Sequence, residues 1–443
     1  MGRRETTLRF FNRNDDFMKG EVEANIEKYR KGDFRFRITD KDGKPLDGAV
    51  VEIEQLTHEF KFGANIFMLD ELETEEKNAA YKKAFAGVFN LATIPFYWDA
   101  LEPERGKPRF DKNSPKIYRR PATDLCVDFC VKNGIEPKCH CLNYDNFAPD
   151  WVRAMGLDDE KAAIEERMRT LAERYSFAIP SWEVTNETLD PDDKSHANKT
   201  PFYNEDDFVE WSFLTADKYF KQNRLIINDY GMFGASFRGN RSPYFMQIER
   251  LLRTVKHLDG IGMQFHGFYK PEDEEKQAYY MYNPRRLYTI LDRYASLDKS
   301  LQITEMTIPA FSASETDVDI QAELIEKIYT LFFSHPSMEA IIYWNLVDGY
   351  AAWAPQGDMT KGENVYYGGL MNFDLTPKKS YAVLRRLIKE NWHTSTSAAT
   401  RNGTATMRGF YGKYSVKVSY GGKTVSFTID ASKRKENFFA FTL

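Results

Sequence analysis

Two glutamates, each at the end of a short β-type run, are the side chains in this sequence best suited to acid–base chemistry. Glu187 closes the run 181–187, and Glu305 closes the run 301–305. A carboxylate at the C-terminal end of a barrel strand lies at the mouth of the barrel, where such folds place their active sites. Two facing carboxylates are the minimum equipment for cleaving a glycosidic bond. The pair therefore predicts hydrolysis of a glycoside.

The elements that must position these glutamates follow a rhythm of strand, polar helix and strand from about residue 60 onward. The candidate strands are 60–66, 88–94, 136–142, 181–184, 224–228, 260–264, 301–304 and 340–344. Eight parallel strands with intervening helices close most economically as an α/β fold of the (β/α)8 TIM-barrel type. In this count Glu187 ends the fourth strand and Glu305 the seventh, on opposite sides of the mouth. An open doubly wound sheet is the alternative, but no G-x-G-x-x-G segment follows any strand.

The regions outside the barrel predict a small accessory β module. After an N-terminal lead at 1–32, residues 33–57 alternate like a β meander, and residues 401–443 alternate around a Gly-Gly hairpin signal. About 45 residues of hairpin are too few to fold alone. We therefore expect the tail at 401–443 to pair with 33–57 beside a catalytic barrel at 58–395.

The composition is that of a globular enzyme without a strong charge bias. The 443 residues are 42% hydrophobic and 29% charged, and the formal net charge is −5. No basic block suggests nucleic acid, and no run of about 18 apolar residues predicts a membrane span. We expect a monomer that binds a polysaccharide or oligosaccharide. The start of the chain lacks an apolar export segment, so the protein either stays inside the cell or is secreted or periplasmic with its signal removed.

Four cysteines allow two interpretations: Cys126, Cys130, Cys139 and Cys141. The spacing C-x3-C followed by C-H-C suggests a metal site, but it matches no common zinc knuckle. Small buried thiols fit the pattern better. We expect neither a metal nor an organic cofactor.

Six segments carry a resemblance to a known family. They are WDALEPERG at 98–106, WEVTNE at 182–187, INDY at 227–230, DGIGMQFH at 259–266, ITE at 303–305 and WNLVD at 344–348 followed by Trp353. Together and in this order, they resemble glycoside hydrolase family 10, the retaining endo-β-1,4-xylanases, over roughly residues 34–392. The resemblance implies a barrel that cleaves β-1,4-xylosidic bonds in xylan or a related plant β-glycan.

The resemblance implies a catalytic role for each glutamate. Glu187 would be the general acid/base and Glu305 the nucleophile of a double displacement. A retaining mechanism needs two carboxyl groups about 5–5.5 Å apart, one ionised and one protonated. Because two carboxylates at that separation disfavour double ionisation, one of them keeps its proton at working pH.

The resemblance also implies substrate-binding residues, namely Asn186, His140, Asp145, Trp151, Gln264, His266, Trp344 and Trp353. Asn186 would hydrogen-bond the sugar 2-hydroxyl, a contact that strengthens in the transition state. Gln264 and His266 would line the side of the nucleophile. Trp344 and Trp353 would wall the sugar at the point of cleavage. For the histidines and tryptophans, ordinary core packing is the alternative.

Several family ligands are absent from this sequence. The stretch 93–98 lacks a Glu-Asn pair and a Lys that family members carry before the tryptophan after strand two. Tyr144 and Asp145 replace a tryptophan and a histidine of the strand-three motif, and Thr307 replaces an acid that supports the sixth-strand histidine. All but the last lie on the glycone side, where the non-reducing part of the substrate binds. Because polar ligands reject sugars that lack the matching hydroxyls, we expect catalysis to be kept and glycone specificity to be shifted.

Two other functions compete with a retaining xylanase. Missing glycone ligands would also suit an exo-acting or aryl β-glycosidase on the same barrel. A non-catalytic carbohydrate-binding protein is the alternative from a different class. The presence of both carboxylates, Asn186 and the tryptophan pair argues against it.

Overall fold

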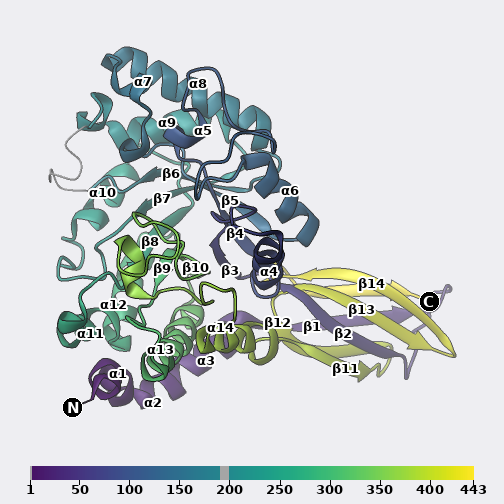
Figure 1. The fold of residues 1–443 in the computed structure, drawn as a ribbon. Helices are drawn as coiled ribbons and strands as arrows, with labels where there is room; N and C mark the ends of the chain where they lie inside the picture. Colours follow the sequence, from purple (N-terminus) through teal and green to yellow (C-terminus); the bar gives the residue numbers. More distant parts are fainter. Residues whose placement is uncertain (1, 190–198) are drawn as a thin grey trace.

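The largest part of the protein is a closed barrel of eight parallel strands. The computed structural model describes residues 2–189 and 199–443. The strands run in the order β10-β3-β4-β5-β6-β7-β8-β9 around the barrel (Figure 1). They are β3 (Lys61–Asn65), β4 (Leu91–Pro95), β5 (Glu136–His140), β6 (Ser181–Asn186), β7 (Arg224–Asp229), β8 (Gly260–His266), β9 (Ser300–Thr307) and β10 (Met338–Tyr343). The predicted (β/α)8 fold is confirmed, and each predicted strand overlaps an observed one.

Helices cover the outside of the barrel. The longer ones are α4 (Glu75–Ala86), α6 (Thr123–Asn133), α8 (Leu157–Tyr175), α9 (Phe208–Tyr219), α10 (Pro243–Leu251), α11 (Glu274–Met281), α12 (Pro284–Ala295), α13 (Glu315–Ser334) and α14 (Lys379–Arg386). Two short helices, α5 (Trp98–Leu101) and α7 (Asp150–Arg153), lie in the loops after β4 and β5. Side-chain caps mark where some helices begin: Ser314 accepts from the backbone N–H of Asp317 at the start of α13.

The barrel strands are buried on both faces. All residues of β4 and β6 are buried, and so are nearly all of β9. Parallel strands covered by helices have no solvent-facing side, which explains their continuous burial. Because the strands are parallel, their carboxyl ends meet at one mouth, and the residues that end β6 and β9 face the same space.

Residues 3–30 are mostly helical and pack against the barrel. Helix α1 (Arg3–Arg13) is followed by α2 (Asp15–Phe17), and a π-helical turn at Met18–Val22 joins α2 to α3 (Glu23–Arg30). Arg3 forms ion pairs with Glu274 of α11 and Asp317 of α13. At the other end, the Arg30 guanidinium donates to the carbonyl of Met338 in β10 at 2.8 Å. The described part of the segment that the sequence predicts to be an N-terminal lead therefore packs on the outside of the barrel.

Two small sheets stand beside the barrel (Figure 1). They have the orders β12-β1-β15 and β11-β2-β13-β14. Their strands are β1 (Lys31–Thr39), β2 (Val50–His58), β11 (Ser395–Ala399), β12 (Thr404–Phe410), β13 (Gly412–Tyr420), β14 (Lys423–Ala431) and β15 (Phe438–Thr442). Strands from the tail pair with both N-terminal strands, β12 with β1 and β13 with β2.

The predicted meander at 33–57 is wrong, because β1 and β2 do not pair with each other. They lie in different sheets, and their buried side chains meet in one cluster that includes Phe34 and Phe36 of β1 and Val51 and Ile53 of β2. Both strands alternate buried and exposed side chains in the same way. Each can therefore bury one face in a sandwich while a tail strand provides hydrogen-bond partners for its backbone. The division of the chain into separate domains stays a prediction.

The four cysteines are unpaired and buried. Burial raises the pKa of the Cys130 thiol to about 12. Of the helices in the part of the chain that the structure describes, none has the length and apolar character to cross a membrane.

Candidate active site

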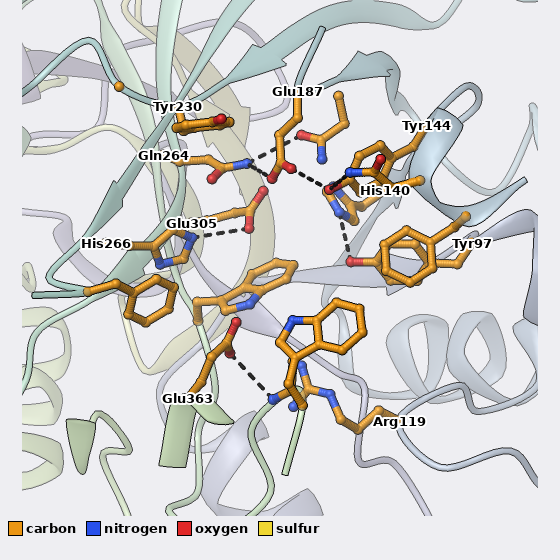
Figure 2. Close-up of a pocket in the computed structure, with 18 of the residues that line it drawn as sticks. Tyr97, Arg119, His140, Tyr144, Glu187, Tyr230, Gln264, His266, Glu305 and Glu363 are labelled. Carbon is orange, nitrogen blue, oxygen red and sulfur yellow. Dashed lines mark hydrogen bonds and ion pairs between the residues drawn. The ribbon is translucent and has the colours of Figure 1, made fainter. Parts of the chain in front are cut away.

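A cavity of about 1310 Å³ opens at the carboxyl ends of the barrel strands. Its lining includes six of the predicted site residues besides Glu187 and Glu305: His140, Asn186, Gln264, His266, Trp344 and Trp353. Figure 2 shows both glutamates pointing into the same space, with Gln264 and His266 beside them. The strand ends therefore bring together residues that are up to 213 positions apart in the sequence.

Glu187 follows β6 directly and has a φ of 52°, in the left-handed region that non-glycine residues seldom adopt. One carboxylate oxygen, Oε1, accepts from Gln264 Nε2 at 2.8 Å. The other oxygen accepts a short hydrogen bond from the hydroxyl of Tyr144. The turn and the two donors hold this carboxylate in the cavity.

Glu305 lies within β9 and is more deeply enclosed. Its Oε1 accepts from Asn228 Nδ2 at 3.0 Å, and its Oε2 lies 3.3 Å from His266 Nε2. Burial raises the pKa of Glu305 to about 8, with the charges of Glu187 and Glu183 adding to the effect against the opposing charge of His140. The ligand-free site therefore holds a proton on this carboxyl at neutral pH.

The hydrogen bonds around His266 agree with a protonated Glu305. Burial lowers the pKa of His266 to about 4, so the imidazole is neutral and carries one N–H. The Thr307 hydroxyl donates to the carbonyl of Trp344 at 3.3 Å and lies 3.0 Å from His266 Nδ1. The hydroxyl then accepts from Nδ1–H, which leaves Nε2 to accept from the Glu305 carboxyl. A threonine, unlike an acid, leaves this histidine uncharged.

Asn186 belongs to an amide network beneath the glutamates. Its Oδ1 accepts from Asn228 Nδ2 at 2.8 Å and from Gln264 Nε2 at 3.4 Å. Because both contacts use the oxygen, the Nδ2 group of Asn186 is left to donate. Asn228 also donates to Glu305, so one side chain fixes both the amide and the carboxyl.

His140 lies on another side of the cavity. Its Nδ1 has a short contact with the Glu183 carboxylate, and its Nε2 lies 3.0 Å from the hydroxyl of Tyr97. Burial alone would lower the pKa of His140, but the Glu183 carboxylate outweighs it, and the pKa is raised. The imidazole therefore places positive charge close to Glu305, where it opposes protonation of that carboxyl.

The two predicted tryptophans differ in exposure. Trp344 is 5% exposed and packs edge-on against Phe67 and His140, with ring centroids 5.1 and 5.4 Å apart. Trp353 is 79% exposed and lies nearly parallel to Phe147, at 6.4 Å. An exposed indole at the edge of a cavity is a surface on which a sugar ring can stack.

Two predicted binding residues, Asp145 and Trp151, are not among those that line the cavity. Asp145 is buried, and its Oδ1 accepts from the backbone N–H and the hydroxyl of Thr200 at 3.0 and 2.6 Å. Trp151 donates to the carbonyl of Glu102 at 3.0 Å and packs edge-on against Trp98. Both lie in short helical turns after β5. In such turns the local direction of the backbone decides which side chains face the cavity, and a match to a family motif does not.

Sequence reasoning missed several residues that line the cavity: Tyr97, Arg119, Arg120, Tyr144, Tyr230, Phe268 and Glu363. Tyr144 had been noted only as a departure from the family, yet its hydroxyl contacts Glu187. The sequence carries no periodic signal for such loop residues. Only their position after a predicted strand end could have suggested them.

Comparisons with known proteins agree with this geometry. The model of glycosyl hydrolase family 10 matches residues 54–386. Endo-1,4-beta-xylanase B of Thermotoga neapolitana is 26% identical over 341 residues, covering 75% of this chain and 88% of that protein. Anti-sigma-I factor RsgI6 of Acetivibrio thermocellus is 23% identical over 412 residues, covering 91% of this chain. The chain spans only about half of that relative, 47%.

Among solved structures, native xylanase 10B from Thermotoga maritima aligns with a TM-score of 0.57 and 22% identity. The alignment covers 75% of this chain and 96% of that one. At this identity the likeness shows the fold, and the family assignment comes from the match at 54–386, which spans most of the chain. On that match, with both glutamates at the mouth of the barrel, the chain belongs to glycosyl hydrolase family 10.

Proposed function

We propose that this glycoside hydrolase cleaves β-1,4-xylosidic bonds in xylan or a related plant β-glycan, with retention of configuration. The observation that carries the proposal is the placement of Glu187 and Glu305 in one cavity, each held by two hydrogen-bonding neighbours. Similarity to endo-1,4-beta-xylanases, including that of Thermotoga neapolitana, supports the proposed substrate.

In the first step, Glu305 attacks the anomeric carbon while Glu187 gives its proton to the leaving glycosidic oxygen. The C–O bond to the leaving sugar breaks, and a glycosyl ester forms on Glu305. This step needs the proton on Glu187, whereas burial places it on Glu305 in the free site. One proton shared by two carboxyls can occupy either, so we expect substrate binding to favour the productive arrangement.

In the second step, Glu187 accepts a proton from water, and the water oxygen attacks the anomeric carbon of the ester. Glu305 leaves as a carboxylate, which Asn228 Nδ2 stabilises from 3.0 Å. Two inversions at the same carbon give net retention. Glu187 ends the cycle protonated, ready for another substrate.

Substrate positioning falls to the neighbours of the glutamates. Asn186 keeps its Nδ2 donor available for a sugar hydroxyl because its oxygen is already used twice. Trp344 and Trp353 offer aromatic faces around the cleavage point. These contacts would orient the anomeric carbon toward Glu305. Holding the reacting atoms in this orientation lowers the activation barrier of the first step.

A second candidate is an exo-acting or aryl β-glycosidase. The observation that favours it is a packed aromatic cluster on the glycone side. The Phe147 ring lies 4.3 Å from the Tyr97 ring and 5.1 Å from the Tyr144 ring, centroid to centroid. Such a cluster narrows the space left for a long glycone.

Product analysis separates these candidates. The enzyme is incubated with linear and decorated xylans, other β-glucans and aryl β-glycosides, and the anomeric configuration of fresh product is followed by proton NMR. We expect short xylo-oligosaccharides of retained β-configuration. Inverted products would contradict the double displacement. Release of single sugars from the non-reducing end would favour the exo alternative, and silence on xylan with cleavage of another β-glycoside would refute the substrate.

A further inference from the structure

Two adjacent arginines line the cavity on the glycone side. Arg119 and Arg120 lie in the loop between α5 and α6, which follows β4. The same connection from β4 to α6 begins with the stretch 93–98, which lacks the sugar ligands that the family resemblance led us to expect. Figure 2 shows Arg119 at the far end of the cavity from Glu187.

Arg120 rests on aromatic rings. Its guanidinium carbon lies 3.9 Å from the centroid of Tyr97 and 5.4 Å from that of Phe147. The only hydrogen bond of its side chain in the described part of the chain is from Nη1 to the carbonyl of Arg119, at 3.0 Å. Burial lowers the pKa of Arg120 to about 10, so the side chain keeps its charge at neutral pH.

Arg119 is 4% exposed and is held by neutral acceptors. Its Nη1 donates to Asn345 Oδ1 at 2.8 Å and to the carbonyl of Tyr350. Its guanidinium carbon lies 5.5 Å from the centroid of Phe67. The hydrogen bonds fix the side chain but do not neutralise it.

Neither arginine forms an ion pair among the residues that the structure describes. No ion pair of 4.0 Å or less between described residues includes Arg119 or Arg120. The carboxyl group of Asp99 attracts Arg120 electrostatically, but it makes no hydrogen bond or ion pair with it in that part of the chain. The other acidic residues that line the cavity are Asp150, Glu187, Glu305 and Glu363. Of these, Glu187 and Glu305 are committed to the catalytic pair, and Glu363 accepts from the backbone N–H of Ala352 at 3.4 Å.

Two neighbouring cations that no carboxylate contacts directly are costly in a partly desolvated wall, even with Asp99 near one of them. A cation–π contact offsets part of that cost for Arg120. The remainder would be offset by a carboxylate, which matches the planar guanidinium fork with two parallel hydrogen bonds. A neutral sugar hydroxyl would accept one hydrogen bond and leave the charge uncompensated.

We propose that Arg119 and Arg120 form a carboxylate-binding site, and that the preferred substrate is an acidic β-glycan whose uronic acid residue lies against this wall. The inference rests on the proposed function, since it assumes that a glycan chain crosses the cavity from Arg120 to Glu187. It also gives the missing glycone ligands a replacement of different chemistry. The enzyme would then select its substrate by charge as well as by hydroxyl pattern.

The test compares two substrates that differ only in charge. One is a xylo-oligosaccharide carrying a glucuronic acid side chain, and the other is the same compound with its carboxyl group reduced to the alcohol. We expect kcat/KM to be about 10–100-fold higher for the acidic substrate, the range for a buried charge-assisted hydrogen bond. Arg120→Gln should lower this ratio to about 1, and Arg120→Lys should give an intermediate ratio because it keeps the charge without the fork.

The control variant is Arg169→Gln, which removes an exposed arginine of α8 that pairs with Glu166 and Glu173. Its substrate ratio should equal that of the wild type. Equal kcat/KM for both substrates with the wild-type enzyme would overturn the carboxylate site and leave the proposed function standing. Cleavage of neither substrate would instead refute the proposed function. The wild-type comparison needs no variant, so it decides the matter even if Arg120→Gln does not fold.

Discussion

Two parts of the cavity hold their side chains in different ways: the floor, which is formed by the ends of the barrel strands, and the wall, which is formed by the loops after β4 and β5. On the floor, Glu305 and Gln264 lie within barrel strands and Glu187 follows one directly, so the parallel ladder fixes where each side chain begins. On the wall, Arg119 and Arg120 lie in a loop and are held by aromatic rings and backbone carbonyls. Under the proposed function, bond cleavage would depend on the rigid part, whereas substrate choice would depend on the part that can vary without disturbing the barrel.

The hydroxyl of Tyr144 joins the two regions. Tyr144 follows β5 on the wall side, packs against Tyr97 and Phe147, and donates to Glu187 on the floor. Its pKa is raised well above the ordinary value by burial and by the Glu187 charge, so it remains a donor through the neutral range. A change in the wall can thereby alter the orientation of the Glu187 carboxyl group.

The largest effect should come from the floor. Glu305→Ala and Glu187→Ala should each lower kcat on xylan by about 10⁴-fold or more, since each removes a group that the proposed mechanism uses in the transition state. Steady-state kinetics with a circular dichroism check of folding measures this. The exposed Glu166→Gln serves as control. Near-wild-type turnover by either alanine variant would remove that residue from the mechanism.

A second effect separates stability from activity on the floor. The folded pKa of Glu305 is about 8 against an ordinary 4.5, so the ionised form is the one that folding disfavours. Its stabilising contribution is complete below about pH 4.5 and is lost as pH rises through 8. Glu305→Gln should therefore raise the free energy of unfolding, by a few kcal/mol at pH 8 and little at pH 4, since one pKa unit is about 1.4 kcal/mol.

Thermal unfolding of the wild type and of Glu305→Gln between pH 4 and pH 9 measures this difference in stability. The same series on Glu166→Gln, whose carboxylate is exposed, should show no such trend. A gap between Glu305→Gln and wild type that stays constant with pH would mean that Glu305 is already ionised in the folded protein.

The contact between wall and floor is the third target. Tyr144→Phe removes the hydroxyl that donates to Glu187 and keeps the ring in its aromatic cluster. We expect kcat to fall about 10-fold, the cost of one hydrogen bond to a charged group, with a smaller change in KM. Tyr279→Phe, at a half-exposed tyrosine of α11, is the matched control. Unchanged kcat would show that the floor holds Glu187 without help from the wall.

The smallest expected effect concerns the partner of His266. Thr307→Asp places a carboxylate near Nδ1, which should raise the pKa of His266 from about 4 and let the imidazolium donate to Glu305. A charged donor favours the Glu305 carboxylate and lowers its pKa. The acid limb of the kcat/KM profile should then move to lower pH by about half a unit, an effect of about 0.7 kcal/mol. An unmoved limb would mean that Glu305 does not control it.

Sequence pattern alone was sufficient for the barrel. Strand length, burial on both faces and the alternation with helices are local signals, and each predicted strand overlaps an observed one. The position of Glu187 and Glu305 at the mouth followed from the same count, because parallel strands end at one edge whatever the loops do. The observed turn at Glu187, with its positive φ, has no such signal in the sequence.

The tertiary structure decided the partners of those elements. Strands β1 and β2 have the same alternating sequence pattern. They lie in different sheets because both pack on a shared core and each pairs with strands of the tail. Asp145 and Trp151 occupy motif positions yet face away from the cavity, while Tyr144 and Arg120 face into it. A strand fixes side-chain direction by its pleat, which is a local property. A loop has no repeating geometry, so the direction of its side chains follows from contacts with residues far away in the chain.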